Sequence, residues 1–528
     1  MHRILVVLLP AAVCGAPLHA ANFSHPYAMN SWTYPAWGCD MLDQAGITAS
    51  RVFIPWWECE QTDVIPPATN YLWTMVKNMI PNCLTNAHRL GHKVHLAIYD
   101  SPSWARSNSS VMLSYPPAKY AEFITGLLEF CERTAPGVVD SVDFGNEDIT
   151  WTSRMEKDPS WYYQHILRAG HAAVKAFNPD IKVLTGSLWG AVSAHQLDEM
   201  YQLGLGPYFD RINLHYYVQG MGPAEDPSYT GDVWHYPTNI RYLKYIAEQN
   251  GDPEKLVWNT EYAWKIAVTE PEKSGYYRQI LDYSRRSGFV DMCAMYPGLS
   301  EDYPSGHDLA ALIYCNDQST PTIIIQTTAY FMYRTYTPQH PTWNPALRET
   351  LPVIPGASTH VAMANPGFEN TIGSEWTGAT RDTAQRHSGA ASGRASNNGA
   401  IVSQYYDAES ARLYEVLAWI KIDASNPSNF YISLYNLYAS GPNNTGVQWW
   451  GPPHYDSVVD TRHYPGTWRR LRYLCLVPAD KNRIALRFEG HGTGTFWIDD
   501  VQIRALNMPE PTIIIRPDVR ITAPAAGA

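Results

Sequence analysis

The sequence predicts an α/β fold, a parallel (β/α)8 barrel (TIM barrel), followed by an antiparallel β-sandwich. From about residue 25 to 340, short apolar runs alternate with amphipathic helical patterns. Near residue 340 the chain becomes proline-rich, and beyond it the apolar residues recur with a period of two, which is typical of half-buried antiparallel strands. A chain of 528 residues is long enough to hold both domains.

Eight apolar runs are candidate barrel strands, and they are too uniformly apolar for a sheet with one solvated face. Helical patterns separate them, such as residues 163–177, whose apolar side chains form one stripe. The alternation indicates a closed barrel with its chemistry at the carboxyl ends of the strands. The eight runs are residues 27–32, 52–55, 93–99, 138–145, 181–186, 209–214, 256–259 and 289–295.

The domain boundaries follow from these changes of pattern. In the second domain Ile484, Leu486 and Phe488 alternate with Arg and Ala, as in a sandwich strand. A proline-rich bridge before it predicts a short, stiff linker. We expect a signal peptide at 1–20, a barrel at 21–340, a linker at 341–357, a sandwich at 358–507 and a C-terminal tail at 508–528.

Composition limits the possible partners. The net charge is −11 and 45% of the residues are hydrophobic, a globular composition with no basic surface for nucleic acid or anionic membranes. The chain holds 19 Trp and 35 Tyr, whose flat rings suit sugar faces but also fill the cores of large domains. The oligomeric state is not readable from the sequence.

The N-terminus has the pattern of an export signal. Arg3 precedes a short apolar stretch at residues 4–13, and Leu18-His-Ala20 resembles a cleavage site. We therefore expect a secreted or periplasmic protein. Seven cysteines remain after Cys14, in no zinc-like spacing, and we expect one or two disulfides at most.

Two glutamates stand where apolar runs end. Glu147 closes Val142-Asp-Phe-Gly-Asn-Glu147, and Glu261 closes Leu256-Val-Trp-Asn-Thr-Glu261. Parallel barrel strands deliver such side chains to one mouth. Two carboxylates facing one cleft are what cleavage of a glycosidic bond requires, because one must be a proton donor while the other stays ionised. Separately, either glutamate is equally well explained as a loop charge.

The motifs around these glutamates resemble those of clan A glycoside hydrolases, closest to family 39 and family 5. Asn146-Glu147 is similar to the fourth-strand Asn-Glu motif, and Trp-Asn-Thr-Glu261-Tyr resembles the seventh-strand nucleophile motif. Other matching positions are Arg51 on the second strand, Trp104 in the third-strand Pro-x-Trp segment, and His215 and Tyr217 in the sixth-strand His-x-Tyr segment. One departure is Tyr296, where many clan members place a sugar-stacking tryptophan.

The resemblance implies a retaining β-glycoside hydrolase that acts on a polysaccharide or oligosaccharide without a catalytic cofactor. Glu147 is then the acid/base and Glu261 the nucleophile, with Arg51 keeping Glu261 charged. Asn146 would hold the sugar 2-hydroxyl, and His215 and Tyr217 would orient the carboxylates. A separation near 5 Å between the carboxyl groups predicts retention, whereas about 8 Å predicts inversion.

Aromatic residues near the strand ends are candidate sugar-stacking walls. They are Trp56, Trp104, Trp264 and Tyr296, and for the tryptophans core packing explains the sequence equally well.

The second domain resembles a family 4/9-type carbohydrate-binding module, a jelly roll. Asn365-Pro-Gly-Phe-Glu369 at its start and Phe496-Trp-Ile-Asp-Asp500 near its end carry this likeness. The likeness implies a structural calcium ion held by Glu369 and Asp500. A pair of buried, hydrogen-bonded carboxylates is the alternative.

Two other function classes remain open on the sequence. A non-catalytic carbohydrate-binding protein could use the barrel cleft and the sandwich for glycan recognition, although the intact glutamate pair argues against it. A metal-dependent hydrolase or lyase would need clustered ligands, and no such spacing is present in the sequence.

Overall fold

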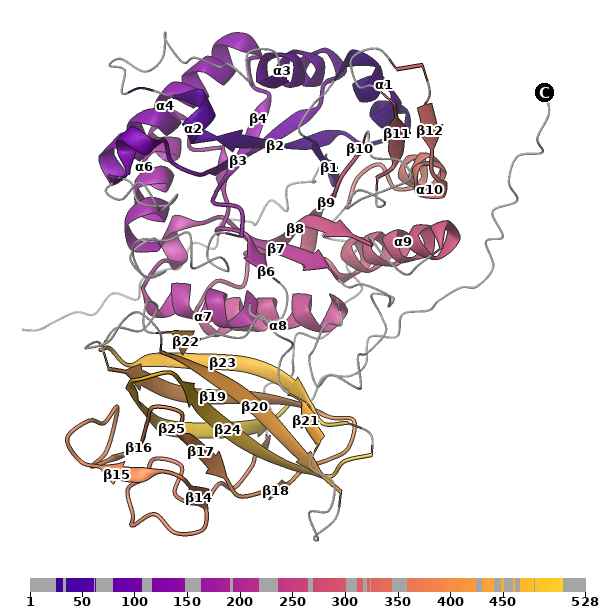
Figure 1. Cartoon of the computed structure of the whole chain (residues 1–528). Coiled ribbons are helices and arrows are strands. Elements are labelled where there is room, and N and C mark those ends of the chain that lie inside the picture. Colours follow the sequence, from indigo (N-terminus) through magenta and orange to yellow (C-terminus); the bar gives the residue numbers. More distant parts are fainter. Residues whose placement is uncertain are drawn as a thin grey trace, which may run out of the picture.

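The computed structural model has an N-terminal barrel and a C-terminal sandwich (Figure 1). It describes residues 25–31, 35–60, 62, 79–106, 116–147, 163–189, 193–217, 236–264, 269–300, 311–316, 321–322, 324–343, 359–423, 430–440, 448–450, 459–460, 466–478 and 480–506. The predicted signal peptide, most of the predicted linker and the C-terminal tail lie outside these residues.

The first domain is the predicted parallel barrel. Its strands run in the order β5-β4-β3-β2-β1-β9-β8-β7-β6. The two ends meet because β5 pairs with β4, β6 pairs with β7, and a parallel bridge joins Leu184 to Arg211. The strands are β1 Tyr27–Ser31, β2 Ala49–Pro55, β3 Lys93–Tyr99, β4 Val139–Phe144, β5 Lys182–Val183, β6 Leu188–Trp189, β7 Arg211–Tyr217, β8 Leu256–Ala263 and β9 Val290–Met295.

Four strands differ from their predicted bounds by three residues or more. The second, expected at 52–55, begins at Ala49 as β2. The fifth strand, expected at 181–186, is split into β5 and β6 around Gly186. The sixth and seventh extend to Tyr217 and Ala263, beyond their predicted ends at 214 and 259. Their last residues include His215 and Glu261, polar side chains that resemble a loop in sequence but complete their strands in the barrel.

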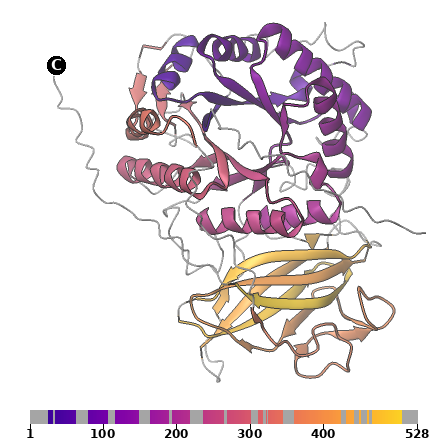
Figure 2. The same cartoon turned by 180° about the vertical axis from the view of Figure 1, so that it is seen from behind.

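Helices surround the strands, as both views show (Figures 1 and 2). Helix α9 begins with a capping box between Thr269 and Glu272 and ends at Gly288, which has a left-handed φ of 63°. Gly170 lets α6 approach the end of β4, since a Cβ there would lie 2.5 Å from the Phe144 ring. The helices are α1 Ala36–Gln44, α2 Trp56–Cys59, α3 Met79–Leu90, α4 Pro117–Thr134, α6 Arg168–Phe177, α7 Ser193–Gln202, α8 Tyr236–Gln249, α9 Glu270–Ser287 and α10 Thr328–Tyr336.

The second domain is the predicted sandwich of two mainly antiparallel sheets. One sheet has the order β15-β16-β25-β19-β23, with β13 paired to β25, and the other has β14-β17-β24-β20-β21. Side chains such as Val416, Phe488 and Ile498 fill the core between them. The longer strands are β16 Ser392–Ser396, β17 Ala400–Ser403, β19 Leu413–Ile422, β20 Tyr431–Ala439, β23 Arg469–Leu476, β24 Arg483–His491 and β25 Thr495–Ala505, and the shorter ones are β13 Thr359–His360, β14 Trp376–Thr377, β15 Thr380–Asp382 and β21 Gln448–Trp450.

The two domains meet through helices α7 and α8, which lie between the barrel strands and the sandwich (Figure 1). At the centre of this contact Arg472 of β23 lies 3.0 Å from Asp198 of α7 and 2.6 Å from Glu415 of β19. Arg470 also pairs with Asp198, at 2.6 Å, and Tyr242 of α8 donates a hydrogen bond to Glu415. Asp198 and Glu415 have no exposed surface, so this domain contact contains a buried ionic network.

All seven cysteines from Cys39 to Cys475 are buried free thiols, so none of the disulfides that the odd count allowed is present among them. In the described part of the chain, no helix is both long and apolar enough to cross a membrane.

Candidate active site

The two glutamates selected from the sequence lie together at the carboxyl ends of the strands. Glu147 follows β4 and has a left-handed φ of 57°, two residues after Gly145 at φ 100°, so the chain turns sharply at the strand end. A non-glycine residue in this conformation is strained, and such strain gathers at functional sites. Oxygens of Glu147 and Glu261 and a ring nitrogen of His215 all lie within 4.8 Å of one another.

Both carboxylate oxygens of Glu261 on β8 accept a hydrogen bond from a side chain of another strand. Arg51 donates from Nη1 to Oε1 at 2.5 Å, and the Tyr217 hydroxyl donates to Oε2 at 2.6 Å. Burial, and then the charge of Glu261, raise the pKa of Tyr217 well above its usual value, so its hydroxyl keeps the proton that it donates. Hydrogen bonds to both oxygens fix the direction in which this carboxylate points.

Glu147 contacts His215, which comes from β7. The His215 Nδ1 atom lies 2.8 Å from Oε1 of Glu147 and 3.5 Å from Oε2 of Glu261. The His215 side chain is fully buried, whereas the Glu147 side chain is 16% exposed. The imidazole therefore bridges the two carboxylates, and one of them remains accessible from the barrel mouth.

Arg51 of β2 is the centre of a polar network beneath the glutamates. Its Nη2 donates to Asn146 Oδ1 at 3.0 Å and to Asp143 Oδ2 at 3.2 Å, and its Nη1 also contacts Asn30. Burial lowers the pKa of Arg51, but Asp143 and Glu261 raise it more, so the guanidinium stays charged. One buried cation thus serves two carboxylates.

Four residues of this network were not identified from the sequence. Asp143 receives a hydrogen bond from Asn213 Nδ2 at 2.8 Å and lies 3.1 Å from His95 Nε2. Asn30 donates to the carbonyl of Thr260 at 2.7 Å, next to the nucleophile candidate. The sequence feature that could have identified them is a polar residue inside an otherwise apolar strand, because a charge buried in a barrel interior needs hydrogen-bonding or ionic partners there.

The candidate stacking residues divide into core and partly exposed groups. Trp56 and Trp264 are 0% and 1% exposed, which favours core packing for both. Trp104 is half-buried, donates to the Glu60 carbonyl and packs edge-on against Trp56. Tyr296 is half-buried beside Phe53.

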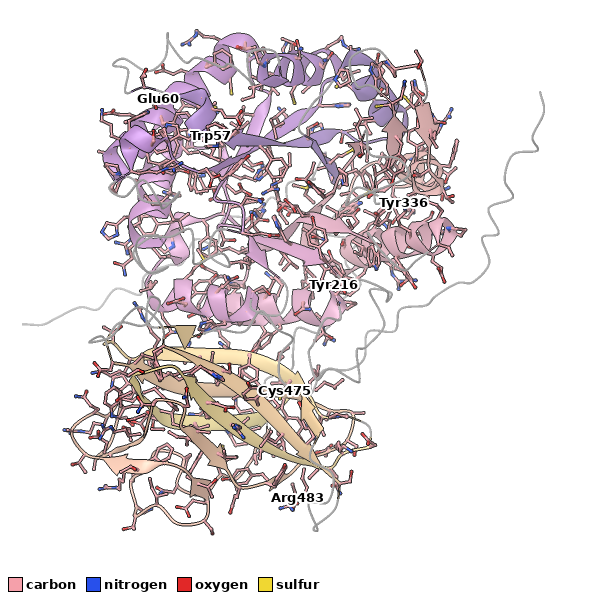
Figure 3. The ribbon with its side chains drawn as sticks, in the orientation of Figure 1. Trp57, Glu60, Tyr216, Tyr336, Cys475 and Arg483 are labelled. Carbon is pink, nitrogen blue, oxygen red and sulfur yellow. The ribbon has the colours of Figure 1, made fainter. Side chains whose placement is uncertain are left out.

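Trp57, the neighbour of Trp56, is 41% exposed on α2, just past the end of β2 (Figure 3). The side chain that remains accessible on this helix is therefore Trp57, which we did not select from the sequence.

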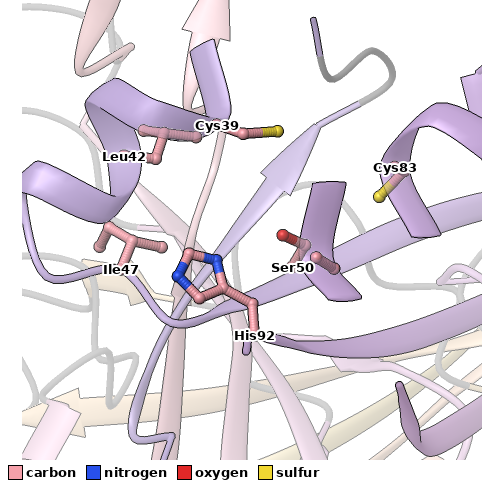
Figure 4. Close-up of a pocket in the computed structure, with 7 residues that line it drawn as sticks. Cys39, Leu42, Ile47, Ser50, Cys83 and His92 are labelled. Atoms are coloured by element: carbon pink, nitrogen blue, oxygen red, sulfur yellow. The ribbon is translucent and has the colours of Figure 1, made fainter. Parts of the chain in front are cut away.

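A separate pocket lies away from this site. Cys39, Ser50, Cys83 and His92 line it, between α1, α3 and the starts of β2 and β3 (Figure 4). Ser50 is the second residue of its strand and His92 precedes β3, so the pocket is at the amino-terminal end of the barrel, opposite the glutamates.

The candidate calcium ligands of the sandwich contact protein donors. Glu369 Oε2 accepts from the Ala390 amide at 2.7 Å. Asp500 accepts from the Ser388 hydroxyl at 2.9 Å, and its Oδ2 lies 2.7 Å from His387 Nδ1. Glu369 and Asp500 therefore both contact the segment 387–390.

No protein-family model matches the sequence, and a search of curated proteins found no match. Some solved structures are similar to the chain. A family 39 glycoside hydrolase from the gut symbiont Bacteroides cellulosilyticus WH2 is 14% identical, with a TM-score of 0.46, and the match covers 88% of this chain and 81% of that one.

A glucosidase from Croceicoccus marinus is 11% identical with a TM-score of 0.46, over 91% of this chain and 96% of that one. A GH5_18 protein from Bifidobacterium longum in complex with Manβ1-4GlcNAc is 14% identical with a TM-score of 0.44, over 60% and 78%. Families 39 and 5, which the motifs suggested, are both represented. At these scores the likeness assigns no activity by itself.

Proposed function

We propose that this protein is a retaining β-glycoside hydrolase that cleaves a polysaccharide or oligosaccharide. The observation that carries the proposal is the pair Glu147 and Glu261, whose nearest oxygens are less than 4.8 Å apart at the barrel mouth. Retaining enzymes place their carboxyl groups about 5 Å apart, because the nucleophile must reach the sugar directly, whereas inverting enzymes leave room for a water molecule.

In this proposal the two carboxyl groups have different tasks. Glu261, ionised and fixed by Arg51 and Tyr217, attacks the anomeric carbon while Glu147 protonates the departing oxygen. A covalent glycosyl ester on Glu261 results, which removes its negative charge. Glu147, now deprotonated, takes a proton from water as that water attacks the anomeric carbon, and the bond from that carbon to Glu261 breaks to release the carboxylate.

Metal-dependent hydrolysis is the competing chemistry, because two carboxylates and His215 converge. The contacts of Glu261 oppose it, since a cation there would lie beside the Arg51 guanidinium and compete with the Tyr217 hydroxyl. Activity that survives dialysis against a chelator supports the glycosidase mechanism, and activity lost to chelation and restored by a divalent ion would replace it.

The experiment is turnover of a panel of aryl β-glycosides by three variants. Glu261→Ala removes the nucleophile and is expected to lower kcat at least about 1,000-fold. Glu147→Ala removes the general acid and base and is expected to lower kcat about 100-fold to 10,000-fold, with the smaller losses for aryl leaving groups that need less protonation. Glu254→Ala, an exposed glutamate, is the control and should leave turnover unchanged. Full activity in Glu261→Ala would contradict the role of Glu261 as the nucleophile. A wild-type protein that binds glycans but hydrolyses none of the panel would be the non-catalytic binding protein.

We also propose export to the periplasm or the medium, on the N-terminal pattern of Arg3 and the apolar stretch after it. N-terminal sequencing of the mature protein tests this, and a chain that retains Met1 contradicts it. The sandwich is proposed to brace the barrel through the network around Arg472.

A further inference from the structure

A third carboxylate lies below the two glutamates and has no part in bond cleavage itself. Asp143 on β4 is fully buried and shares the guanidinium of Arg51 with Glu261. Its Oδ2 accepts hydrogen bonds from Asn213 Nδ2 at 2.8 Å and from Arg51 Nη2 at 3.2 Å. It is four residues before Glu147, so it points into the barrel below the catalytic mouth.

The surroundings of Asp143 keep it ionised. Burial raises the pKa of Asp143, but Arg51, His95 and His215 together lower it by more, so the pKa of Asp143 lies below its ordinary value. His95 faces it from β3, and burial lowers the pKa of that imidazole, so His95 is neutral. Of the groups that face Asp143, Arg51 therefore carries the permanent positive charge, and His215 is the imidazole that also contacts Glu147 and Glu261.

The charge of Asp143 affects the two glutamates at the barrel mouth. Asp143 and Glu261 carry two negative charges against the one positive charge of Arg51. The uncompensated charge opposes ionisation of any further carboxyl group nearby, which favours the neutral, proton-donating form of Glu147. The same charge competes with Glu261 for the guanidinium of Arg51, which both carboxylates contact.

We propose that Asp143 is a positioning residue that acts through Arg51 and sets the pH range in which Glu261 is ionised while Glu147 is protonated. This inference rests on the proposed glycoside hydrolysis. It predicts that both limbs of the bell-shaped pH profile depend on the charge of Asp143, because the acidic limb reports Glu261 and the basic limb reports Glu147.

The test is the pH profile of kcat/KM for an aryl β-glycoside. Asp143→Asn keeps the shape and removes the charge, and we expect both limbs to move to lower pH by about half a unit or more. Asp143→Glu restores the charge and should return the profile to that of the wild type. The control is Asp291→Asn, since Asp291 is also buried and paired with an arginine, Arg211 at 2.9 Å, but at the amino-terminal end of the strands.

If Asp143→Asn lowers the maximum of kcat/KM but leaves both limbs of the pH profile at the same pH, the inference is overturned and Asp143 has only a structural role. Should that variant not fold, Asp143→Glu decides, because a profile displaced to lower pH while the charge is kept contradicts the inference. Wild-type protein that turns over no glycoside, or unchanged turnover in Glu261→Ala, counts against the proposed function instead, so the two failures are distinguishable.

Discussion

Replacing Arg472 by methionine tests whether the ionic network joins the sandwich to the barrel. The Arg472 side chain is 3% exposed and lies 3.0 Å from Asp198 and 2.6 Å from Glu415. It also donates to Gln249 Oε1 at 2.6 Å. Methionine keeps much of the aliphatic packing and removes these contacts, so the variant isolates the charge.

The size of the effect follows from what the two carboxylates retain. Breaking a buried ion pair by removing one partner costs about 3–5 kcal/mol, because a charge is left uncompensated. Asp198 still has Arg470, and Glu415 still has Arg504 and Tyr242. We therefore expect a loss near the lower end of that range, about 3 kcal/mol of unfolding free energy.

Urea unfolding of the full chain, followed by tryptophan fluorescence and far-UV circular dichroism, measures the loss. Arg89→Met is the control, since Arg89 and its partner Asp40 are each 47% exposed, and such a pair contributes less than about 1 kcal/mol. An Arg472→Met protein as stable as Arg89→Met would refute the idea that the buried network stabilises the domain contact.

Three further results are expected. Tyr217→Phe removes a charge-assisted hydrogen bond to Glu261 and should lower kcat/KM about 10-fold to 100-fold with unchanged unfolding, whereas wild-type kinetics would show that this bond is unimportant. Burial raises the pKa of Asp198, but Arg470 and Arg472 lower it more, so that the pKa lies below its ordinary value. The stabilisation of the fold by the Asp198 carboxylate is therefore present above about pH 4 and is lost as the pH falls further. The difference in unfolding free energy between wild type and Asp198→Asn should shrink below that pH, and a constant difference contradicts this. Burial raises the pKa of the Cys475 thiol to about 12, and the other cysteines are buried as well, so the native mature protein should react slowly with a thiol reagent. The denatured protein should show seven reactive thiols, and fewer would reveal a disulfide.

The sequence located the barrel strands well because apolar runs are a local property. Glu147 and Glu261 were found in this way, since each stands three residues after an apolar residue of a barrel strand, Phe144 and Trp258. The sequence ended the sixth and seventh strands too early, because polar residues such as His215 resemble a loop. In the barrel these polar side chains form hydrogen bonds with residues from other strands, and those bonds offset the free-energy cost of burying them.

Contacts between distant residues could not be read from the sequence. Arg51 reaches Asp143 across 92 positions and Glu261 across 210. The choice between Trp56 and Trp57 depended on the direction of one short helix, since adjacent helical residues point about 100° apart. Buried polar residues such as Asp143 marked the network, but only the fold showed which partners they meet.

The most direct test of the central claim is to trap the covalent intermediate. Wild-type protein is incubated with an activated 2-deoxy-2-fluoro β-glycoside of a sugar that it hydrolyses, and peptides are mapped by mass spectrometry. The fluorine slows the second step, so a glycosyl ester should accumulate on Glu261 and inactivate the enzyme. Turnover without any labelled peptide, or a label on another residue, would contradict the assignment of Glu261 as the nucleophile.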